Sequence, residues 1–301
     1  MILVLLLHFF TTLSFGEIHP LKLKTLWSVD SSQIASRMDL SGLSTDGTSL
    51  FTVSDLSDLN DIYRIDLQES GAVLRIHQKL DADWMQQYAQ ENAQYGRLDM
   101  EGIAWCAGQF YIVNEHKRSV LRIGSGAYQE LVPDWENFHK GRMNPFSGVE
   151  NAGLEAVACN GTDLYLFNER QFRMGYVYSL TSEKLTHQFD IPSGPNLPRF
   201  LVEQWMYADF AGAHYEDGVL YLLERNSHQI IKVDPKSYQV LARYDFSQWE
   251  KGLFTTKDPY GLAEGLTIFN GSFFVVLDNN LDLRSKDQSP MPYLLELTAE
   301  H

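Results

Sequence analysis

The 301-residue chain has only two cysteines and few basic residues, 24 Lys and Arg against 39 Asp and Glu. Two cysteines are too few for a disulfide-built scaffold, and a formal net charge of -15 argues against a protein that binds nucleic acid by neutralising phosphates. Such an excess of negative charge instead attracts cations, or is neutralised locally by a bound metal. The hydrophobic content of 44% is typical of a packed globular protein.

The motifs of several common enzyme classes are also missing. The chain has no Gly-x-Ser-x-Gly, the turn that presents the nucleophilic serine of α/β-hydrolases. It has neither His-Glu-x-x-His nor a phosphate-binding Gly-rich loop that ends in Lys-Ser/Thr. Any catalysis therefore has to come from other residues.

Long apolar runs are absent except at the N-terminus, where residues 1–16 read MILVLLLHFFTTLSFG. The run is shorter than the ~20 residues needed to span a bilayer, which makes a membrane anchor the weaker alternative. The small residues Ser14 and Gly16 favour cleavage before Glu17, so we interpret the segment as a signal peptide. The sequence predicts one domain over residues 17–301, periplasmic or secreted, with no stable membrane span after cleavage.

An internal repeat organises the rest of the chain. Five segments have the same order of parts: a polar or acidic starting residue, a short hydrophobic run, a turn, and a second hydrophobic run that is followed by an acid. The starting residues are Ser41, Glu101, Glu155, Asp209 and Glu264, and the closing acids are Asp55, Glu115, Glu169, Glu224 and Asp278. The spacing is 14 residues in every copy except the fourth, where it is 15. Self-similarity of this kind indicates a repeat architecture.

Each copy consists of predicted strands separated by hairpin turns such as Asn270-Gly271. Four copies contain a third and a fourth strand, whereas the last has only a third, at residues 293–297. The spare strand lies at the other end of the chain, at residues 23–29, and would close the ring without leaving a long bare sheet edge. The sequence therefore predicts an all-β fold, a β-propeller of four-stranded blades. Five blades are favoured, and six, with residues 81–96 in a degenerate copy, are the alternative.

The repeated acids are expected at one mouth of the central channel, because first strands begin and second strands end on the same face of a propeller. Crowded carboxylates repel one another unless some are protonated or a cation is bound. Calcium accepts about six to eight oxygen ligands at flexible geometry. We predict a Ca²⁺ site with the ligands Glu101, Glu155, Asp209, Glu264, Asp278 and Asn279. The alternative is that the acids cap backbone groups or pair with arginine, since Arg225 directly follows Glu224.

Long connections between blades are expected over the same mouth, and they carry aromatic residues and much of the scarce positive charge. A cationic, aromatic surface above an acidic, metal-holding mouth suits a small organic anion such as a phosphate ester. The predicted substrate-binding residues are Arg97, His139, Arg142, Arg199 and Lys257. The alternative is that the aromatic residues only pack the loops onto the blades.

The two cysteines, Cys106 and Cys159, lie near the ends of first strands in neighbouring blades. They follow the repeat glutamates by five and four residues, so their side chains should point to opposite faces of a strand. A disulfide formed after export is one alternative, but the pattern favours two small buried hydrophobic residues.

The repeat also resembles a known family. The segments that carry the resemblance are Asp99-Met-Glu-Gly-Ile103, Gly153-Leu-Glu-Ala156, Ala263-Glu-Gly-Leu266 and Val275-Val-Leu-Asp-Asn-Asn280. They are similar to the family called esterase-like activity of phytase and to the related SdiA-regulated, YjiK-like exported propellers. The resemblance implies an exported, calcium-binding propeller with phosphatase or esterase activity. At matching positions it implicates Glu101, Glu155, Glu264, Asp278 and Asn279.

Three functional hypotheses follow. The first is a metal-dependent hydrolase of phosphoric or carboxylic esters, with Glu101, Glu155 and Glu264 as catalytic candidates, one of them acting as base. The second is a non-catalytic binding propeller at the cell envelope, whose metal holds the blades together. The third is a glycoside hydrolase with two carboxylates, which ranks last because a catalytic pair should break the symmetry of the repeat.

Overall fold

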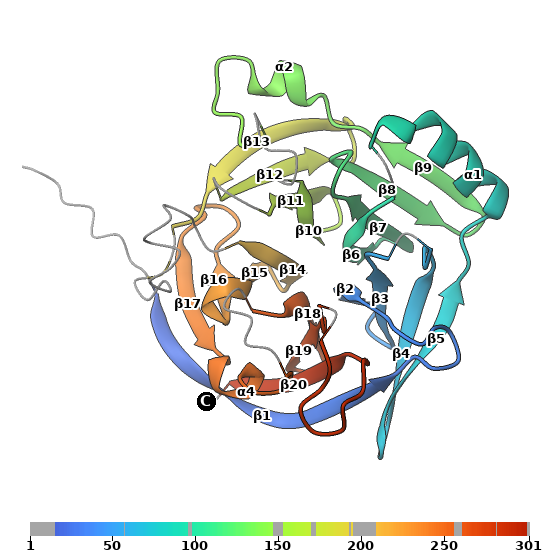
Figure 1. Cartoon of the computed structure of the whole chain (residues 1–301). Coiled ribbons are helices and arrows are strands. Elements are labelled where there is room, and N and C mark those ends of the chain that lie inside the picture. The colour runs from blue at the N-terminus through green and yellow to red at the C-terminus, as the bar shows by residue number, and fades with distance from the viewer. Residues whose placement is uncertain are drawn as a thin grey trace, which may run out of the picture.

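The computed structural model describes residues 16–56, 58–95, 98–146, 153–169, 173–192, 194, 209–255, 261–280 and 282–299. In this part of the chain, antiparallel strands are arranged as blades around a central axis (Figure 1). The prediction of a β-propeller of four-stranded blades is confirmed. The predicted signal peptide lies, apart from Gly16, outside the described residues, and no helix among those described is long and apolar enough to cross a membrane.

The blades follow one another in chain order, and each begins with its innermost strand. The first contains β2 (Leu40–Thr45), β3 (Leu50–Ser54), β4 (Ile62–Gln68) and β5 (Gly71–Gln78). The second contains β6 (Met100–Cys106), β7 (Gln109–Asn114), β8 (Ser119–Gly124) and β9 (Ala127–Leu131). The third contains β10 (Leu154–Cys159), β11 (Asp163–Asn168), β12 (Met174–Ser179) and β13 (Lys184–Asp190).

The fourth blade contains β14 (Phe210–Glu216), β15 (Val219–Glu224), β16 (Gln229–Val233) and β17 (Val240–Asp245). The last contains β18 (Ala263–Phe269), β19 (Ser272–Leu277) and β20 (Tyr293–Ala299), with β1 (Glu17–Asp30) outside them. Short helices lie in the connections: α1 (Ala82–Glu91), η1 (Ala93–Tyr95), α2 (Trp135–His139), η2 (Arg225–Ser227) and α4 (Ser247–Glu250). Residues 82–91, the core of the only candidate for a further blade, thus form a helix.

Strand β1 closes the ring by pairing with three blades. Residues Glu17–Pro20 pair in parallel with β17, Leu21–Ser28 pair antiparallel with β20, and Val29 and Asp30 pair in parallel with β5. The prediction that the N-terminal strand completes the last blade is confirmed. The strand also joins the outer edges of the two blades on either side, as its long arc in Figure 1 shows.

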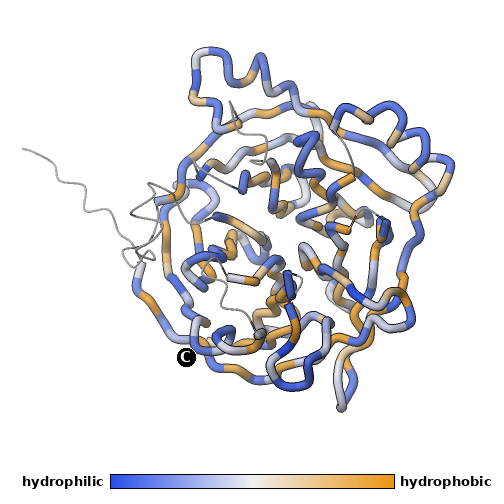
Figure 2. Tube along the Cα trace, in the orientation of Figure 1, coloured by the Kyte–Doolittle hydropathy of each residue, from blue (hydrophilic) through white to orange (hydrophobic). Residues whose placement is uncertain are grey.

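The core consists of hydrophobic clusters between consecutive blades, in which the buried face of one blade packs on that of the next. Val113 and Val120 of the second blade, for example, share a cluster with Leu166 of the third. A corresponding cluster joins the last blade to the first. Hydrophobic residues follow the strands of the ring, whereas α1 and α2 at its periphery are mostly hydrophilic (Figure 2). Because burial of one Leu or Val side chain contributes about 1.5–3 kcal/mol, these interfaces hold the ring together.

The innermost strands lie close together because the repeat places a small residue after its starting position. A Cβ atom on Gly102 would lie 2.8 Å from the Cα of Ala156, and one on Gly265 would lie 2.6 Å from the backbone nitrogen of Leu43. Each innermost strand also has a register shift at this point, as between Leu154 and Ala156. A β-bulge leaves a residue unpaired and redirects its side chain. In the second, third and last blades, the residues left unpaired include the starting glutamates Glu101, Glu155 and Glu264, which the bulges therefore turn toward the channel.

Cys106 and Cys159 form a disulfide, which corrects the prediction of two unbonded, buried cysteines. Their Cα atoms are 6.0 Å apart across the interface between the second and third blades. The two side chains point to opposite faces of their strands, which seemed to exclude a disulfide. A disulfide between neighbouring blades requires this arrangement. Ala104 and Cys106 face the third blade, while Val157 and Cys159 face the second, because stacked blades meet through opposite faces.

Candidate functional site

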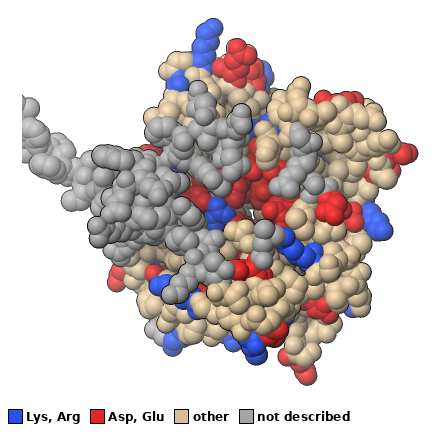
Figure 3. All heavy atoms as spheres, viewed as in Figure 1, with Lys and Arg blue, Asp and Glu red and all other residues tan. Residues whose placement is uncertain are grey.

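Strand pairing defines two rings of equivalent residues at one mouth of the channel. Leu154 pairs with Asn168, and Ala263 pairs with Leu277 at the equivalent place in the last blade. The residue that follows the first member of each pair belongs to the first ring, and the residue that follows the second member belongs to the second ring. The first ring consists of Ser41, Glu101, Glu155, Ala211 and Glu264, and the second of Asp55, Glu115, Glu169, Arg225 and Asp278. All of these except Ala211 line a cavity of about 260 Å³. Acidic side chains accordingly gather around the centre of this face (Figure 3).

The fourth blade differs from the prediction. Phe210 pairs with Glu224, so the ring residues of this blade are Ala211 and Arg225 rather than Asp209 and Glu224. The spacing is therefore 14 residues here as well, and the predicted spacing of 15 is wrong. Both acids of the repeat are replaced in this blade, one by a methyl group and one by a guanidinium group.

Glu224 points away from the channel into the fourth blade. Its side chain is fully buried and forms ion pairs with Arg173 and, at 3.2 Å, with Arg243. Asp209 lies two residues before the ring position. It forms an ion pair with Arg225, which lines the cavity, whereas Asp209 itself does not line it. The sequence left open that the acids pair with arginine rather than bind a metal, and Glu224 does pair with arginine.

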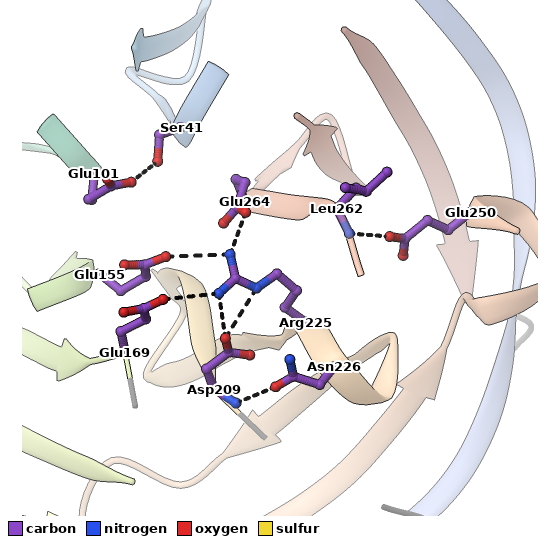
Figure 4. A network of polar contacts seen from close by, with 10 residues as sticks. All are labelled: Ser41, Glu101, Glu155, Glu169, Asp209, Arg225, Asn226, Glu250, Leu262 and Glu264. Atoms are coloured by element: carbon purple, nitrogen blue, oxygen red, sulfur yellow. Dashed lines mark hydrogen bonds and ion pairs between the residues drawn. The ribbon is translucent and has the colours of Figure 1, made fainter. Parts of the chain in front are cut away.

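Arg225 carries the only Arg or Lys charge among the described residues that line the cavity. Its guanidinium group lies 3.6 Å from Glu155 and 3.4 Å from Glu169, and forms closer ion pairs with Asp209 and Glu264. The four carboxylates surround the guanidinium group (Figure 4). One side of the acidic mouth is thus neutralised by the chain itself.

A compact group of acids beside a histidine overlaps with the carboxylates around Arg225. Carboxylate oxygens of Glu115, Glu155 and Glu169 lie within 4.8 Å of one another. Glu115 is buried, and its Oε1 has no hydrogen-bond partner in the part of the chain that the structure describes. Nδ1 of His116 lies 2.6 Å from Oδ2 of Asp99 at the cavity wall. Buried carboxylate oxygens of this kind are the ligands that a hard divalent cation prefers, so the donor set fits calcium.

Burial raises the pKa of five carboxyl groups of the cavity, and neighbouring carboxylates add to the effect. Burial, followed by the charge of Glu169, raises the pKa of Glu115 to about 8. Burial raises the pKa of Glu264 to about 7, against the opposing effect of Arg225. Burial also raises the pKa values of three further groups well above their usual range, namely Glu101, Glu155 and Asp278. Without a bound cation, several of these groups hold protons near neutral pH.

We expect the metal-free chain to lose stability as the pH rises from about 5 to 8. Unfolded glutamates titrate near 4.3, whereas Glu115 and Glu264 titrate at about 8 and about 7 in the folded chain. The folded state therefore binds more protons in this range, and the free energy of unfolding falls as the pH rises. Melting temperatures in EDTA at several pH values measure the effect. Glu115→Gln, which cannot titrate, should flatten the fall; a melting temperature that rises over this range in wild type would contradict the expectation.

The structure brings most of the predicted acids together. Glu101, Glu155, Glu264 and Asp278 line the cavity. Asn279 does not, because its amide donates to the carbonyl of Pro290 and holds the loop that follows the strand. Asn280 lines the cavity in its place.

Of the five predicted substrate-binding residues, the structure describes two, and both lie away from the cavity. Arg97, Arg199 and Lys257 lie outside the described residues. His139 is buried in an aromatic cluster, with Nε2 3.3 Å from the hydroxyl of Tyr176, and the guanidinium group of Arg142 lies 4.4 Å from the ring centroid of Phe138. Neither residue lines the cavity. The aromatic residues around α2 pack this loop onto the blades, as the alternative interpretation held.

Asp99 and His116 are cavity residues that the repeat did not predict. Asp99 precedes the first-ring Glu101 by two residues, and His116 directly follows the second-ring Glu115. The sequence signal for them is the segment Asp99-Met-Glu101, which begins one hairpin, and the segment Glu115-His116, which follows its second strand. The sequence marked Arg225 only as a pairing partner for acids.

A family model described as phytase-like, esterase-like activity of phytase, matches residues 38–281. Among solved structures, the chain is similar to glutaminyl cyclase from Myxococcus xanthus, with a TM-score of 0.58 and 13% identity, covering 95% of this chain and 100% of that one. It is also similar to a luciferin-regenerating enzyme, with a TM-score of 0.47 and 12% identity, covering 91% and 95%. For the PQQ-bound aldose sugar dehydrogenase of Streptomyces coelicolor, the TM-score is 0.47 and the identity 12%, and the match covers 93% of this chain and 98% of that one. No curated protein matches.

Proposed function

The chain belongs to the phytase-like family described as esterase-like activity of phytase, and on this premise we propose that it is a metal-dependent hydrolase of phosphoric or carboxylic esters. The observation that carries the proposal is the buried group of Glu115, Glu155 and Glu169, whose oxygens lie within 4.8 Å of one another in an otherwise acidic cavity. The substrate class is a small organic anion. The proposed cation is Ca²⁺.

The metal ligands in this proposal are Glu115, Glu155 and Glu169, with Asp99 and Glu101 beside them in the cavity wall. Asp209 and Glu264, which the sequence predicted as ligands, bind Arg225 instead. When bound, a divalent cation supplies positive charge for an anionic substrate and polarises its ester oxygen. Without that charge, an anion would be repelled by the carboxylates that surround it.

The remaining chemistry falls to the residues of the chain. Glu155, which belongs to the acid group and also contacts Arg225, accepts the proton of the attacking water. The hydroxyl of Ser41 donates a hydrogen bond to Glu101 and fixes the orientation of that carboxyl group. Asp99 fixes the imidazole of His116, which is 36% exposed and so is placed to give a proton to the leaving group at the mouth. Hydrolysis then needs no nucleophilic serine.

We also propose that the protein is exported and that residues 1–16 are removed as a signal peptide. The disulfide between Cys106 and Cys159 supports this, because disulfides form and persist in oxidising compartments. The apolar N-terminal run is the second support.

The function is tested with purified residues 17–301 on an aryl phosphate and an aryl carboxylic ester. We expect hydrolysis of at least one substrate with calcium in excess, loss of activity in EDTA, and recovery when calcium is restored. Glu115→Gln should raise the calcium concentration needed for half-maximal activity, because it removes one ligand. Glu91→Gln, an exposed change on α1, is the matched control and should leave the calcium dependence unchanged. If neither substrate is hydrolysed with calcium, the proposal is refuted.

A non-catalytic binding propeller is the second candidate, and one observation favours it. The proposed ligands come from consecutive blades, Glu115 from the second and Glu155 and Glu169 from the third. A bound ion would therefore join these blades as the disulfide does. A melting temperature that EDTA lowers, in a chain that hydrolyses neither ester, would support this function instead.

A further inference from the structure

Arg225 stands where every other blade has an acid. The second ring reads Asp55, Glu115, Glu169, Arg225 and Asp278, and the first ring has Ala211 in the same blade. We propose that the guanidinium group of Arg225 is a built-in cation, which fills one of two cation positions at the channel mouth and limits the chain to one divalent ion. The position of that ion rests on the proposed function, whereas the role of Arg225 rests on the ring itself.

The contacts of Arg225 are those of a cation in an acidic site. Four carboxylates reach it from three blades, namely those of Glu155, Glu169, Asp209 and Glu264. The side chain is 12% exposed, so these charges interact with little screening by water. A calcium ion held by side chains typically receives several carboxylates from separate segments in the same way. The guanidinium group lies at the centre of the four (Figure 4).

The fourth blade is also shaped to admit this side chain. Ala211 takes the place of a first-ring glutamate of the second, third and last blades and packs in a hydrophobic cluster, so no first-ring carboxylate of this blade competes for Arg225. Gly261 has a positive φ of +83°, and a Cβ atom there would lie 2.8 Å from the carbonyl oxygen of Arg225 and 3.1 Å from its Cγ. The two departures from the ring pattern, Ala211 and Arg225, thus occur in the same blade, and Gly261 leaves room for the Arg225 side chain.

Two carboxylates are shared between this position and the proposed metal site. Glu155 and Glu169 contact Arg225 and also belong to the group that includes Glu115. The guanidinium group and a divalent ion would thus share these two carboxylates. Loss of the guanidinium charge leaves four carboxylates facing one another in a buried space, which a second ion can neutralise.

The test compares Arg225→Gln with Arg225→Lys, which keeps the positive charge. Calcium bound per chain is measured by equilibrium dialysis and elemental analysis, and melting temperature is measured against calcium concentration. We expect one ion in wild type and in Arg225→Lys, and two in Arg225→Gln. In EDTA, Arg225→Gln should melt below wild type, and calcium should raise its melting temperature more than that of wild type, because two ions bind only the folded chain.

The possible results separate this inference from the proposed function. If Arg225→Gln binds one ion as wild type does, the inference is overturned and the proposed metal site stands. If wild type binds no ion but Arg225→Gln binds one, the inference holds and the proposed metal site fails. If Arg225→Lys folds, whereas calcium does not restore the stability of Arg225→Gln, a metal cannot replace the guanidinium group and the inference is overturned.

Discussion

Glu155→Gln is expected to lower kcat/KM for the calcium-dependent ester by about 10²- to 10⁴-fold, the usual contribution of a positioned general base. Glu155 is suited to this role because it is a first-ring carboxylate that lies near Glu115 and Glu169 and also contacts Arg225. Glutamine keeps the shape of the side chain but cannot accept a proton. The measurement is steady-state hydrolysis at saturating calcium, where weaker metal binding is compensated.

The same variant should not unfold the chain. Glu155 is one of several crowded carboxyl groups, and burial and neighbouring charges raise its pKa well above the usual range. Removal of its charge relieves repulsion, so the melting temperature in EDTA at alkaline pH should equal or exceed that of wild type. Glu91→Gln again serves as the control on the surface. Full activity of Glu155→Gln at saturating calcium would exclude Glu155 as the base.

Glu224→Gln is expected to destabilise the protein by about 3–5 kcal/mol, the usual cost of removing one partner from a buried ion pair. Glu224 is fully buried and lies between the guanidinium groups of Arg173 and Arg243, both of which are also buried. Arg243 also donates to Oε1 of Gln229 at 3.2 Å, but that group carries no charge. Without the carboxylate, the charges of Arg173, next to β12 of the third blade, and Arg243, on β17 of the fourth, lose their shared partner. Urea denaturation measures the loss.

A surface ion pair provides the matched control for this effect. Asp66 pairs with Arg64 and Arg75 and its side chain is 29% exposed. Because exposed pairs contribute about 0–1 kcal/mol, Asp66→Asn should change the free energy of unfolding by no more than that. If the loss in Glu224→Gln is as small as in Asp66→Asn, the buried pair does not stabilise the blade as described.

The propeller and most of the acidic mouth could be predicted from the sequence, because the signals are local. Hydrophobic runs and turn residues define strands such as β18 and β19, and a fixed spacing of 14 residues relates Glu101 to Glu115 and Glu264 to Asp278. The spare strand at the N-terminus could be assigned because a ring without it would have an open edge.

The fourth blade could not be predicted in the same way, because its register depends on a bulge. Asp209 and Glu224 attract attention as acids, whereas Ala211 has no chemical signal. Only the pairing of Phe210 with Glu224 shows that the ring residue is Arg225. A shift of one residue exchanges the face on which a side chain lies, so an acid counted toward the channel is in fact buried in the blade.

The disulfide and the loops depend on how parts of the chain meet in space. Whether Cys106 reaches Cys159 depends on the stacking of two blades, about which alternation within one strand says nothing. His139 sits on a loop whose aromatic neighbours have a hydrophobic surface to cover, and that packing takes it away from the mouth. The sequence drew attention to Cys106, Cys159 and His139, but it did not show which parts of the fold their side chains would contact.

The long strand β1 has a consequence for how the chain folds. Leu21 pairs with Ala299, and Lys24 contacts Glu296, so the bonds that close the ring join residues about as far apart in sequence as the domain allows. Contacts of such long range slow folding, since a large loop must close before they form. During synthesis β1 emerges first and β20 last, and β1 has no partner in its own blade until β18 to β20 have been made. Until then the edges of β5, β17 and β20 are exposed and can pair with other chains, so closure by β1 also removes three sites for misassembly during folding.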